Sequence, residues 1–378
     1  MRGRVYRRSG GWAYVVDLPR DPASGMRRQR QRSGFPTRKA AEAHLAGLLG
    51  EIGTGAVADT GRRLLSSWLD EWLESIESSV SPSTYELNRT AVTKWVVPRL
   101  GALRLSEVTP KHVQDFVRDL QKTGGRSGGE LGPRSVRQAH QVLAKAFDRA
   151  VEWRLTPNNP ARQGITLPKM EHRQMRPLDT SEVRRFLEVT EGDRLGPLWC
   201  LLVTTGLRRG EALGLRWHDV SLTNAQLQVR QTIITVGGAV QVSTPKTSTS
   251  RRVVYLSSRT VEALELQRRR QEEERTVAGA AWTESDLVFT TALGTPLHPR
   301  NVLRDFQGAL EKAGITKIRI HDLRHTAATL LLQEGVNPKV VQELLGHSRV
   351  AITLDIYSHT TEGLHREAAD VMDLALKS

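Results

Sequence analysis

Apolar positions between residues 64 and 76 repeat at the three- and four-residue spacing of an α-helix with one buried face. They are Leu64, Leu65, Trp68, Leu69, Trp72, Leu73 and Ile76. Ser81-Pro82 and Thr109-Pro110 each place a cap residue before a proline, which suits the first turn of a helix. A further amphipathic stretch begins near Pro133 and turns Val136, His140, Leu143, Phe147 and Val151 inward. This pattern predicts a four-helix unit over residues 62–158.

The pattern before residue 62 is different. Gly11 to Val16 reads Gly-Trp-Ala-Tyr-Val-Val, and a run of aromatic and β-branched residues is typical of a strand. Turns are expected at residues 9–11 and at Asp21-Pro22, followed by a short helix capped by Thr37. The glycine-rich residues 50–61 are interpreted as a linker, so residues 1–55 form a small β-rich domain.

A second linker is predicted where residues 155–169 are rich in Pro and Asn and follow neither period. The remaining domain, 172–378, is mostly helical with a short antiparallel sheet, because residues 225–236, 239–243 and 251–256 alternate as strands do. Apolar positions near the C-terminus predict a last helix, which packs either on its own domain or on a neighbouring protomer. The fold class is therefore mainly α with small β-sheets (α+β).

Charge is concentrated at one end of the chain. The formal net charge is +14, and residues 1–40 hold eleven Lys and Arg against Asp17 and Asp21, which is +9. A solvated basic tail is the simple alternative, but the strand pattern disfavours it. We expect a surface that binds a polyanion. Its candidate DNA-binding residues are Arg2, Arg4, Arg27, Arg28, Arg30 and Arg32.

Composition excludes several classes of protein. Cys200 is the single cysteine, so no disulfide can form within the chain, and no apolar run reaches membrane-spanning length. We therefore expect a cytoplasmic location and no membrane partner. The sequence contains neither a phosphate-binding P-loop nor a dinucleotide fingerprint, and no cofactor is expected.

The pentapeptide His321-Asp322-Leu323-Arg324-His325 has two competing interpretations. Two histidines four residues apart on a helix can bind zinc. However, the acid is Asp rather than Glu, and Arg324 would place a permanent cation beside the metal. The alternative is a phosphate clamp centred on Arg324, with His321 handling a proton and His325 packing. Chance placement at a helix start is the third possibility.

Other candidates are ambiguous when taken singly. Arg208 is followed three residues later by Glu211, a spacing that brings the two side chains together on a helix, as many surface pairs do. Lys246 lies in a polar turn between predicted strands, where most lysines are only solvated. His347 is expected at the end of a short helix, where a capping role is the simple explanation. Tyr357 follows ten residues later and could be an ordinary core residue.

Taken together and in order, these residues resemble the active site of tyrosine site-specific recombinases, the phage integrase family. The stretches "TGLRRGEALGLRW", "HDLRHTAAT" and "LGHSRVAITLDIYSH" are similar to the family's usual wording. The resemblance implies a catalytic set of Arg208, Lys246, His321, Arg324, His347 and the nucleophile Tyr357, with Glu211 orienting Arg208. It also implies a core-binding, SAM-like domain at 62–158 and an arm-type DNA-binding domain at 1–55.

The chemistry of these residues fits that resemblance. A tyrosine that attacks DNA keeps the phosphodiester energy in a covalent 3′-phosphotyrosine, so no ATP is needed. The phenol has an ordinary pKa of about 10, and two arginines on the non-bridging oxygens stabilise the charge that develops. His321 is expected to titrate near neutrality and carry the nucleophile's proton, and Lys246 to protonate the leaving oxygen. No metal is expected.

The resemblance further implies partners. These are double-stranded DNA at core and arm attachment sites, three more copies of the chain in a tetramer that passes through a Holliday junction, a host DNA-bending protein and an excisionase. A chromosome-dimer resolvase, a type IB topoisomerase, a DNA-binding regulator without catalysis and a metalloprotease are the alternatives. The basic β unit favours the integrase, because such resolvases resemble residues 62–378 only.

Overall fold

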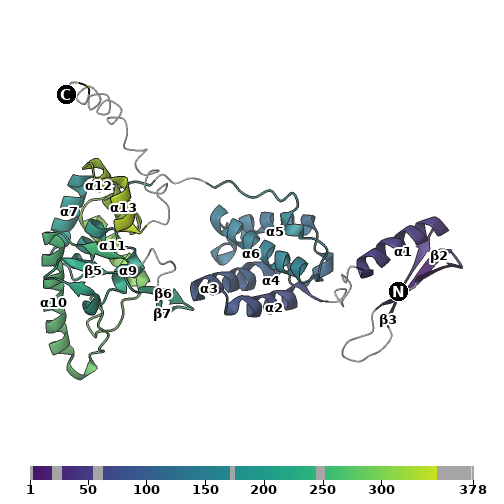
Figure 1. Ribbon diagram of the computed structural model, residues 1–378, viewed down its shortest axis with the longest axis horizontal. Coiled ribbons are helices and arrows are strands. Elements are labelled where there is room, and N and C mark those ends of the chain that lie inside the picture. The colour runs from purple at the N-terminus through teal and green to yellow at the C-terminus, as the bar shows by residue number, and fades with distance from the viewer. Residues whose placement is uncertain are drawn as a thin grey trace. The chain divides into compact units, whose positions relative to one another are not determined.

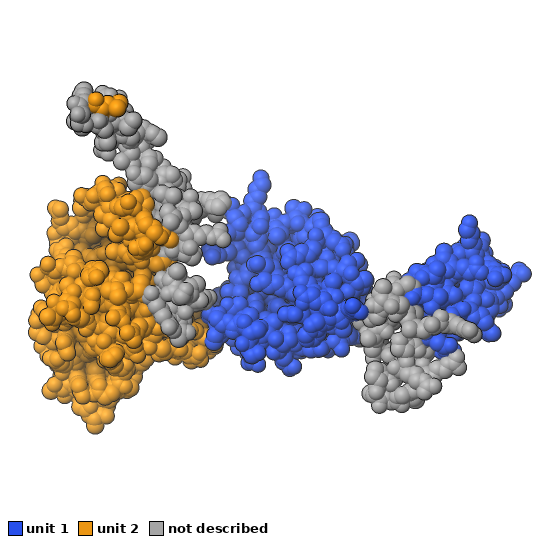
Figure 2. Space-filling model, viewed as in Figure 1, with its two compact units in different colours: residues 1–172 blue, residues 173–378 orange. Residues whose placement is uncertain are grey.

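The computed structural model describes residues 3–18, 28–53, 63–170, 175–243, 252–346 and 376. The chain divides into two compact units, residues 1–172 and 173–378, shown in blue and orange in Figure 2. Each has its own hydrophobic cores. Among the described residues, no helix combines the length and the apolarity that crossing a bilayer requires.

The first unit begins with a three-stranded antiparallel sheet in the order β1-β2-β3, covered by helix α1 (Figure 1). Tyr14 and Val16 of β2 pack against Leu45 and Leu48 of α1 and form the core of this part. Thr37 accepts a hydrogen bond from the amide of Ala40 and caps the helix, as predicted. The elements are β1 (Gly3–Arg8), β2 (Gly11–Leu18), β3 (Arg28–Phe35) and α1 (Arg38–Gly53).

Helix α1 continues into the stretch that was assigned to a linker, so the predicted start of the linker at residue 50 is wrong by four residues. A glycine inside a helix costs only about 1 kcal/mol relative to alanine. The apolar residues of α1 that are buried on the sheet offset that cost. Tertiary packing therefore extends the helix past the point where local propensity ends it.

The rest of the first unit is helical, with a core that contains Trp68, Phe116 and Phe147. Two predicted helix starts are confirmed, since α3 begins after Ser81 and α5 after Thr109. Thr109 and His112 form a reciprocal capping box at the start of α5. The helices are α2 (Leu65–Glu77), α3 (Pro82–Ala91), α4 (Val97–Leu100), α5 (Pro110–Thr123) and α6 (Pro133–Glu152), with a π-helical turn, Val92–Val96, joining α3 to α4.

The second unit is mostly helical around a core in which Phe306 contacts both Phe186 and Trp199. Its helices are α7 (Thr180–Thr190), α8 (Gly196–Thr205), α9 (Arg209–Leu213), α10 (Ser258–Ala278), α11 (Pro299–Lys312), α12 (Asp322–Gln333) and α13 (Pro338–Leu345). Its strands are β4 (Val220–Ser221), β5 (Gln226–Gln228), β6 (Thr232–Val236), β7 (Ala239–Ser243) and β8 (Val253–Tyr255).

The predicted single sheet of this unit is instead two antiparallel sheets. One has the order β4-β5-β8, and the other is the hairpin β6-β7. Leu227 of β5 faces Val254 of β8, whereas β7 pairs with β6 over its whole length. The segment that contains Lys246 therefore connects two different sheets and is not the turn of one hairpin. Period-2 alternation identifies strands but does not say which strands pair.

Candidate active site

Arg208 is placed by a sharp turn between two helices. Helix α8 ends at Gly206, whose φ of 61° lies in the left-handed region. A Cβ atom at this position would lie 2.3 Å from a methyl group of Leu345, so both the backbone and the packing require glycine. Two residues later Arg208 takes the N-cap position of α9. The Thr-Gly-Leu-Arg sequence thereby sets the arginine at the start of a helix.

The predicted contact between Arg208 and Glu211 is present. Nη1 of Arg208 donates to Oε1 of Glu211 at 2.7 Å, and the Arg208 amide donates to Oε2 at 3.0 Å. The Glu211 side chain is only 4% exposed, whereas that of Arg208 is 39% exposed. The buried carboxylate thus holds one edge of a guanidinium that stays open to solvent.

Glu211 also binds a second arginine that sequence reasoning missed. Arg252, immediately before β8, donates from Nη2 to Oε2 of Glu211 at 3.1 Å and is 7% exposed. Burial by itself would raise the pKa of Glu211, but the charge and hydrogen bonds of Arg252 and Arg208 outweigh it and lower the pKa. Glu211 is therefore ionised at neutral pH.

Arg324 is a buried cation with unused hydrogen-bonding capacity. It lies on α12, is 2% exposed, and donates from Nη1 to the carbonyl of Gly206 at 2.7 Å. Its Nη2 is buried and has no hydrogen-bond partner among the residues that the structure describes. Burial first, and then the charge of Arg208, lower the pKa of Arg324 to about 9. A buried donor without an acceptor is costly, and a site of this kind favours an anion.

His321 stands at the N-terminus of α12, with its ring perpendicular to that of His325 and the ring centroids 5.1 Å apart. Partial desolvation of the ring, followed by the charges of His325 and Arg324, lowers the pKa of His321 to about 4. In the protein without DNA this pKa lies below the neutral range that the sequence leads one to expect. Its imidazole is neutral at pH 7 and can accept a proton.

In the described part of the chain, no group of three or more His, Cys, Asp or Glu side chains lies close enough together to hold a metal ion. The acid between the two histidines, Asp322, accepts from the guanidinium of Arg319 at 2.7 Å and from its amide at 2.8 Å. The arrangement of this helix start is that of an ion pair beside two imidazoles.

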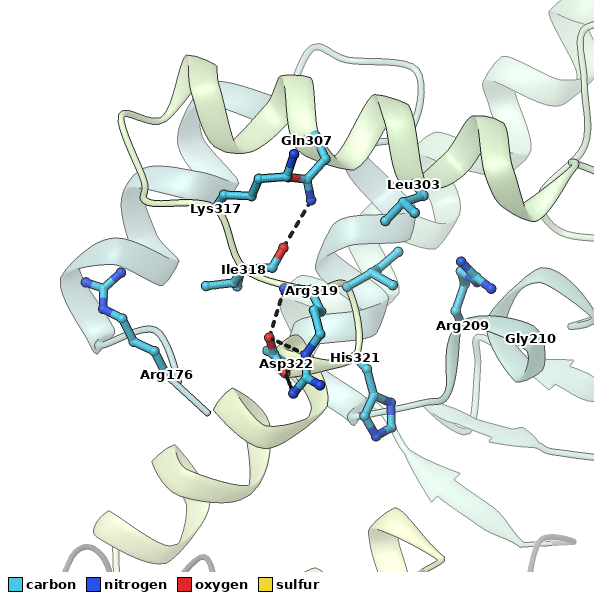
Figure 3. Close-up of a pocket in the computed structure, with 11 residues that line it drawn as sticks. Arg176, Arg209, Gly210, Leu303, Gln307, Lys317, Ile318, Arg319, His321 and Asp322 are labelled. Atoms are coloured by element: carbon cyan, nitrogen blue, oxygen red, sulfur yellow. Dashed lines mark hydrogen bonds and ion pairs between the residues drawn. The ribbon is translucent and has the colours of Figure 1, made fainter. Parts of the chain in front are cut away.

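A pocket of about 830 Å³ adjoins His321 (Figure 3). Arg176, Arg209, Lys317 and Arg319 lie around an apolar floor that includes Leu303. Arg319 and Arg176 are paired with carboxylates, whereas Arg209 donates to the carbonyl of Pro299 at 3.4 Å. The walls of this pocket are therefore rich in cations and suit an anionic ligand.

Three of the predicted site residues, Lys246, His347 and Tyr357, lie outside the described residues, as do Arg2 and Arg27. The backbone of Arg28 belongs to β3, but its side chain is not described. The structure thus brings together Arg208, Glu211 and Arg324 through contacts with the α8–α9 turn. It places His321 three residues before Arg324.

The N-terminal sheet separates the predicted DNA-binding arginines by face. Directly paired residues of antiparallel strands share a face. Arg32 pairs with Tyr14 and Arg30 with Val16, so both arginines lie on the face that α1 covers. Nη1 of Arg32 donates to Nε2 of His44 in α1 at 2.8 Å.

We call the opposite side of this sheet, which is turned away from α1, the outer face. It carries Arg4, Tyr6, Gln29 and Gln31, because Arg4 and Gln31 both pair with Val15. The Gln31 amide donates to the Tyr6 hydroxyl, and Gln29 donates to Asp17 at 2.9 Å. Among the predicted arginines with described side chains, only Arg4 lies on the outer face.

Arg252 and the pocket cations were missed for a simple reason. Arg251-Arg252 was interpreted only as the start of a strand, although an arginine pair next to the Lys246 segment was a usable signal. Arg176 and Arg209 are separated from the HxxR stretch by more than 100 residues, so no spacing rule connects them. Only the folded chain shows that they line one pocket.

Comparison with family models matches three parts of the chain. Residues 176–363 match the "Phage integrase family", residues 64–121 match "Phage integrase, N-terminal SAM-like domain", and residues 4–52 match "Arm DNA-binding domain". These matches cover the part that contains Arg208 and Arg324, the helical part and the N-terminal sheet.

Two curated relatives align over most of their length. A XerC-like tyrosine recombinase of Caldanaerobacter subterraneus subsp. tengcongensis is 30% identical over 357 residues, covering 89% of this chain and 90% of the relative. The ICEBs1 integrase of Bacillus subtilis is 27% identical and is aligned over 97% of both chains. Among solved structures, the Tn1549 transposon integrase in complex with a circular intermediate DNA superposes with a TM-score of 0.66 at 20% identity, covering 82% of this chain and 99% of that one, which shows a shared fold.

Proposed function

Because the chain belongs to the phage integrase family of tyrosine recombinases, we propose that it integrates, and also excises, a phage or another mobile element at specific DNA sites. Its substrate is double-stranded DNA. Each strand is cut by attack of the Tyr357 hydroxyl on phosphorus, which forms a 3′-phosphotyrosine and releases a 5′ hydroxyl. The reverse attack by a 5′ hydroxyl from the other site reseals the strand, and the two exchanges pass through a Holliday junction.

The observation that carries this proposal is the pair Arg208 and Arg324 at the α8–α9 turn. Attack on the phosphodiester adds negative charge to the non-bridging oxygens, and preformed cationic donors stabilise that charge. Arg324 has a buried donor that no described residue binds, and Arg208 has an exposed edge. Because Glu211 and Gly206 hold these guanidinium groups before DNA binds, little reorganisation is needed during the reaction.

Proton transfers are assigned to three residues. His321 is neutral at pH 7 and accepts the proton of the Tyr357 hydroxyl during attack, and a nearby phosphate raises its basicity. His347 donates a hydrogen bond to a phosphate oxygen. Lys246 gives a proton to the leaving 5′ oxygen. These roles follow from the family resemblance and the side-chain chemistry, and no divalent metal takes part.

The cationic pocket beside His321 is proposed to hold the DNA backbone next to the scissile phosphate. Phosphate contacts fix the position of a protein on a duplex without specifying sequence. Arg209 and Lys317 are suited to this, and burial lowers the pKa of Arg209, a cost that an adjacent phosphate would offset. Binding in this pocket would therefore place the cleaved bond relative to the arginines.

Different domains of the chain are proposed to bind different DNA sites. We assign core-site binding to residues 62–158 together with the catalytic domain, 172–378, and arm-site binding to residues 1–55. Four protomers on two sites perform the pairwise exchange, helped by a host DNA-bending protein and an excisionase. The C-terminal helix docks either on its own domain or on a neighbour. A chromosome-dimer resolvase is the second candidate function, because a XerC-like recombinase is among the relatives.

A nicked suicide substrate tests the central step. When the short strand beyond the cut diffuses away, religation is prevented and the covalent intermediate accumulates. The native chain is expected to yield a covalent protein–DNA adduct that remains intact in denaturing gel electrophoresis when no protease is added. Tyr357→Phe, which removes only the attacking oxygen, is expected to bind the same DNA and yield no adduct. An equal yield of adduct from the phenylalanine variant would exclude Tyr357 as the nucleophile.

A further inference from the structure

The structure places one buried arginine between Glu211 of α9 and the C-terminal turn of α13. Arg252 donates from Nη2 to Glu211 at 3.1 Å and from Nε to the carbonyl of Leu344 at 2.7 Å. Glu211 in turn binds Arg208. Leu344 lies in the last turn of α13, and the segment that contains Lys246 joins the strand at Arg252. We propose that Arg252 is a positioning residue for DNA strand cleavage that acts through Glu211 and the end of α13.

The first effect of Arg252 concerns charge. A lone carboxylate beside Arg208 would neutralise the guanidinium that is meant to bind the phosphate. Glu211 is instead shared, with Oε1 on Arg208 and Oε2 on both the Arg208 amide and Arg252. Arg252 thereby balances the buried carboxylate, and the positive charge of Arg208 stays available to the DNA. A buried ion pair that loses one partner leaves an uncompensated charge, so this balance is sensitive to substitution.

The second effect concerns geometry. The last carbonyls of a helix have no partner within the helix and attract cations. Arg252 binds the carbonyl of Leu344, and Nη2 of Arg208 binds the carbonyl of Gly346 at 3.1 Å. Two arginines that share one carboxylate thus also hold the C-terminal turn of α13. His347, a candidate catalytic residue, follows Gly346 directly in the sequence.

The fork of an arginine side chain is needed for this arrangement. The planar guanidinium holds its N–H donors in a fixed arrangement, and here Nε donates to the carbonyl of Leu344 while Nη2 donates to the carboxylate of Glu211. A lysine keeps the positive charge but has a single nitrogen on a flexible stem. We therefore expect Arg252→Lys to preserve the charge balance and to lose the fixed geometry.

The experiment uses the full chain on the suicide substrate and rests on the proposed function. Arg252→Gln is expected to bind core DNA like the native chain and to lower the single-turnover cleavage rate about 100-fold, the effect of a misplacement of about 1 Å. The cleavage rate of Arg252→Lys is expected to lie between those of the native chain and Arg252→Gln. Arg194→Gln is the matched control, because Arg194 also binds a carboxylate, Glu274, and a carbonyl, that of Thr290, away from the candidate site residues.

A double-mutant cycle separates positioning from a general structural role. If Arg252 acts through Glu211, then Arg252→Gln should slow cleavage less in a Glu211→Gln background than it does in the native chain. If the two substitutions lower the cleavage rate by factors that simply multiply, the proposal is overturned. It is also overturned if Arg252→Gln and Arg194→Gln lower the melting temperature and the cleavage rate to the same extent. If the native chain forms an adduct and Tyr357→Phe does not, the proposed recombinase function is supported whatever the Arg252 variants do. The experiment can therefore contradict the role of Arg252 without contradicting the proposed function.

Discussion

At the scale of single residues, the candidate site contains a buried cation, Arg324, that contributes little to the stability of the folded protein. Arg324 is buried beside the charges of Arg208 and Arg252, and its pKa is lowered to about 9. Within the described part of the chain, one of its nitrogens has no hydrogen-bond partner. Such a group contributes poorly to stability but needs no rearrangement when a phosphate arrives, which is the usual conflict between stability and activity at an active site.

Replacing this cation should therefore separate activity from stability. Arg324→Met keeps a similar length without the charge. Cleavage of the suicide substrate is expected to fall by at least about 100- to 1,000-fold, the effect of removing one donor to a developing oxyanion. The unpaired carbonyl of Gly206 costs about 1–3 kcal/mol, whereas burying an unbalanced ion costs several. The melting temperature should not fall, and calorimetry of both proteins without DNA checks this.

His321 gives a second residue-scale prediction. In the protein without DNA its ring should titrate near pH 4, as followed by the nitrogen chemical shifts of the imidazole and assigned with His321→Gln. Binding of uncleaved core DNA to the Tyr357→Phe protein should raise this pKa, because a phosphate beside the ring favours the protonated form. An unchanged pKa in the complex would mean that the ring does not face the phosphate.

At the scale of elements, the N-terminal sheet shows how strand register decides which side chains can meet DNA. A strand sends alternate residues to opposite faces. Arg30 and Arg32 share a face with the core residues Val16 and Tyr14. The charge count along the chain therefore overstates the number of arginines that the outer face presents. Besides Arg4, its polar groups include Tyr6, Gln29 and Gln31.

This difference between faces can be measured. A glutamine amide forms two hydrogen bonds with adenine in the major groove, and one such pair contributes about 1–3 kcal/mol of discrimination. Gln31→Ala is expected to reduce the preference of the full chain for arm DNA over scrambled DNA. Arg32→Ala, its neighbour on the opposite face, should leave that preference intact and lower the stability of the sheet through its lost contact with His44. Equal loss of preference in both variants would contradict the assignment of faces.

At the scale of the whole molecule, charge and cleavage chemistry lie in different parts of the chain. Residues 1–40 contribute +9 of the net charge of +14, whereas Arg208 and Arg324 belong to the second unit. If residues 1–55 serve arm sites alone, deleting them should leave core-site cleavage largely intact and abolish integration between full attachment sites.

The salt dependence of binding gives the same deletion a quantitative measure. Each phosphate neutralised by the N-terminal domain steepens the plot of log K against log salt by about 0.9. The native chain should therefore show a steeper slope on arm DNA than the chain without residues 1–55. Complete recombination by the shortened chain on minimal core sites would instead favour a resolvase.

The sequence alone determined the features that depend on neighbours along the chain. These features involve residues only a few positions apart, for which the local geometry is the same in any fold. They are the helix starts at Ser81 and Thr109, the strand around Tyr14, and the contact between Arg208 and Glu211. The family resemblance also came from residue types in order along the chain, namely Arg208, Lys246, His321, Arg324, His347 and Tyr357.

Only the tertiary structure decided what depends on distant contacts. Arg252 meets Glu211 across 41 residues, and Arg324 meets Gly206 across 118. The pKa of His321 depends on burial and on neighbouring charges, which are not properties of the pentapeptide. The separation of the strands into two sheets and the side of the sheet on which Arg32 lies both follow from strand pairing. Pairing and burial are set by the whole chain, because they minimise the free energy of all its contacts together.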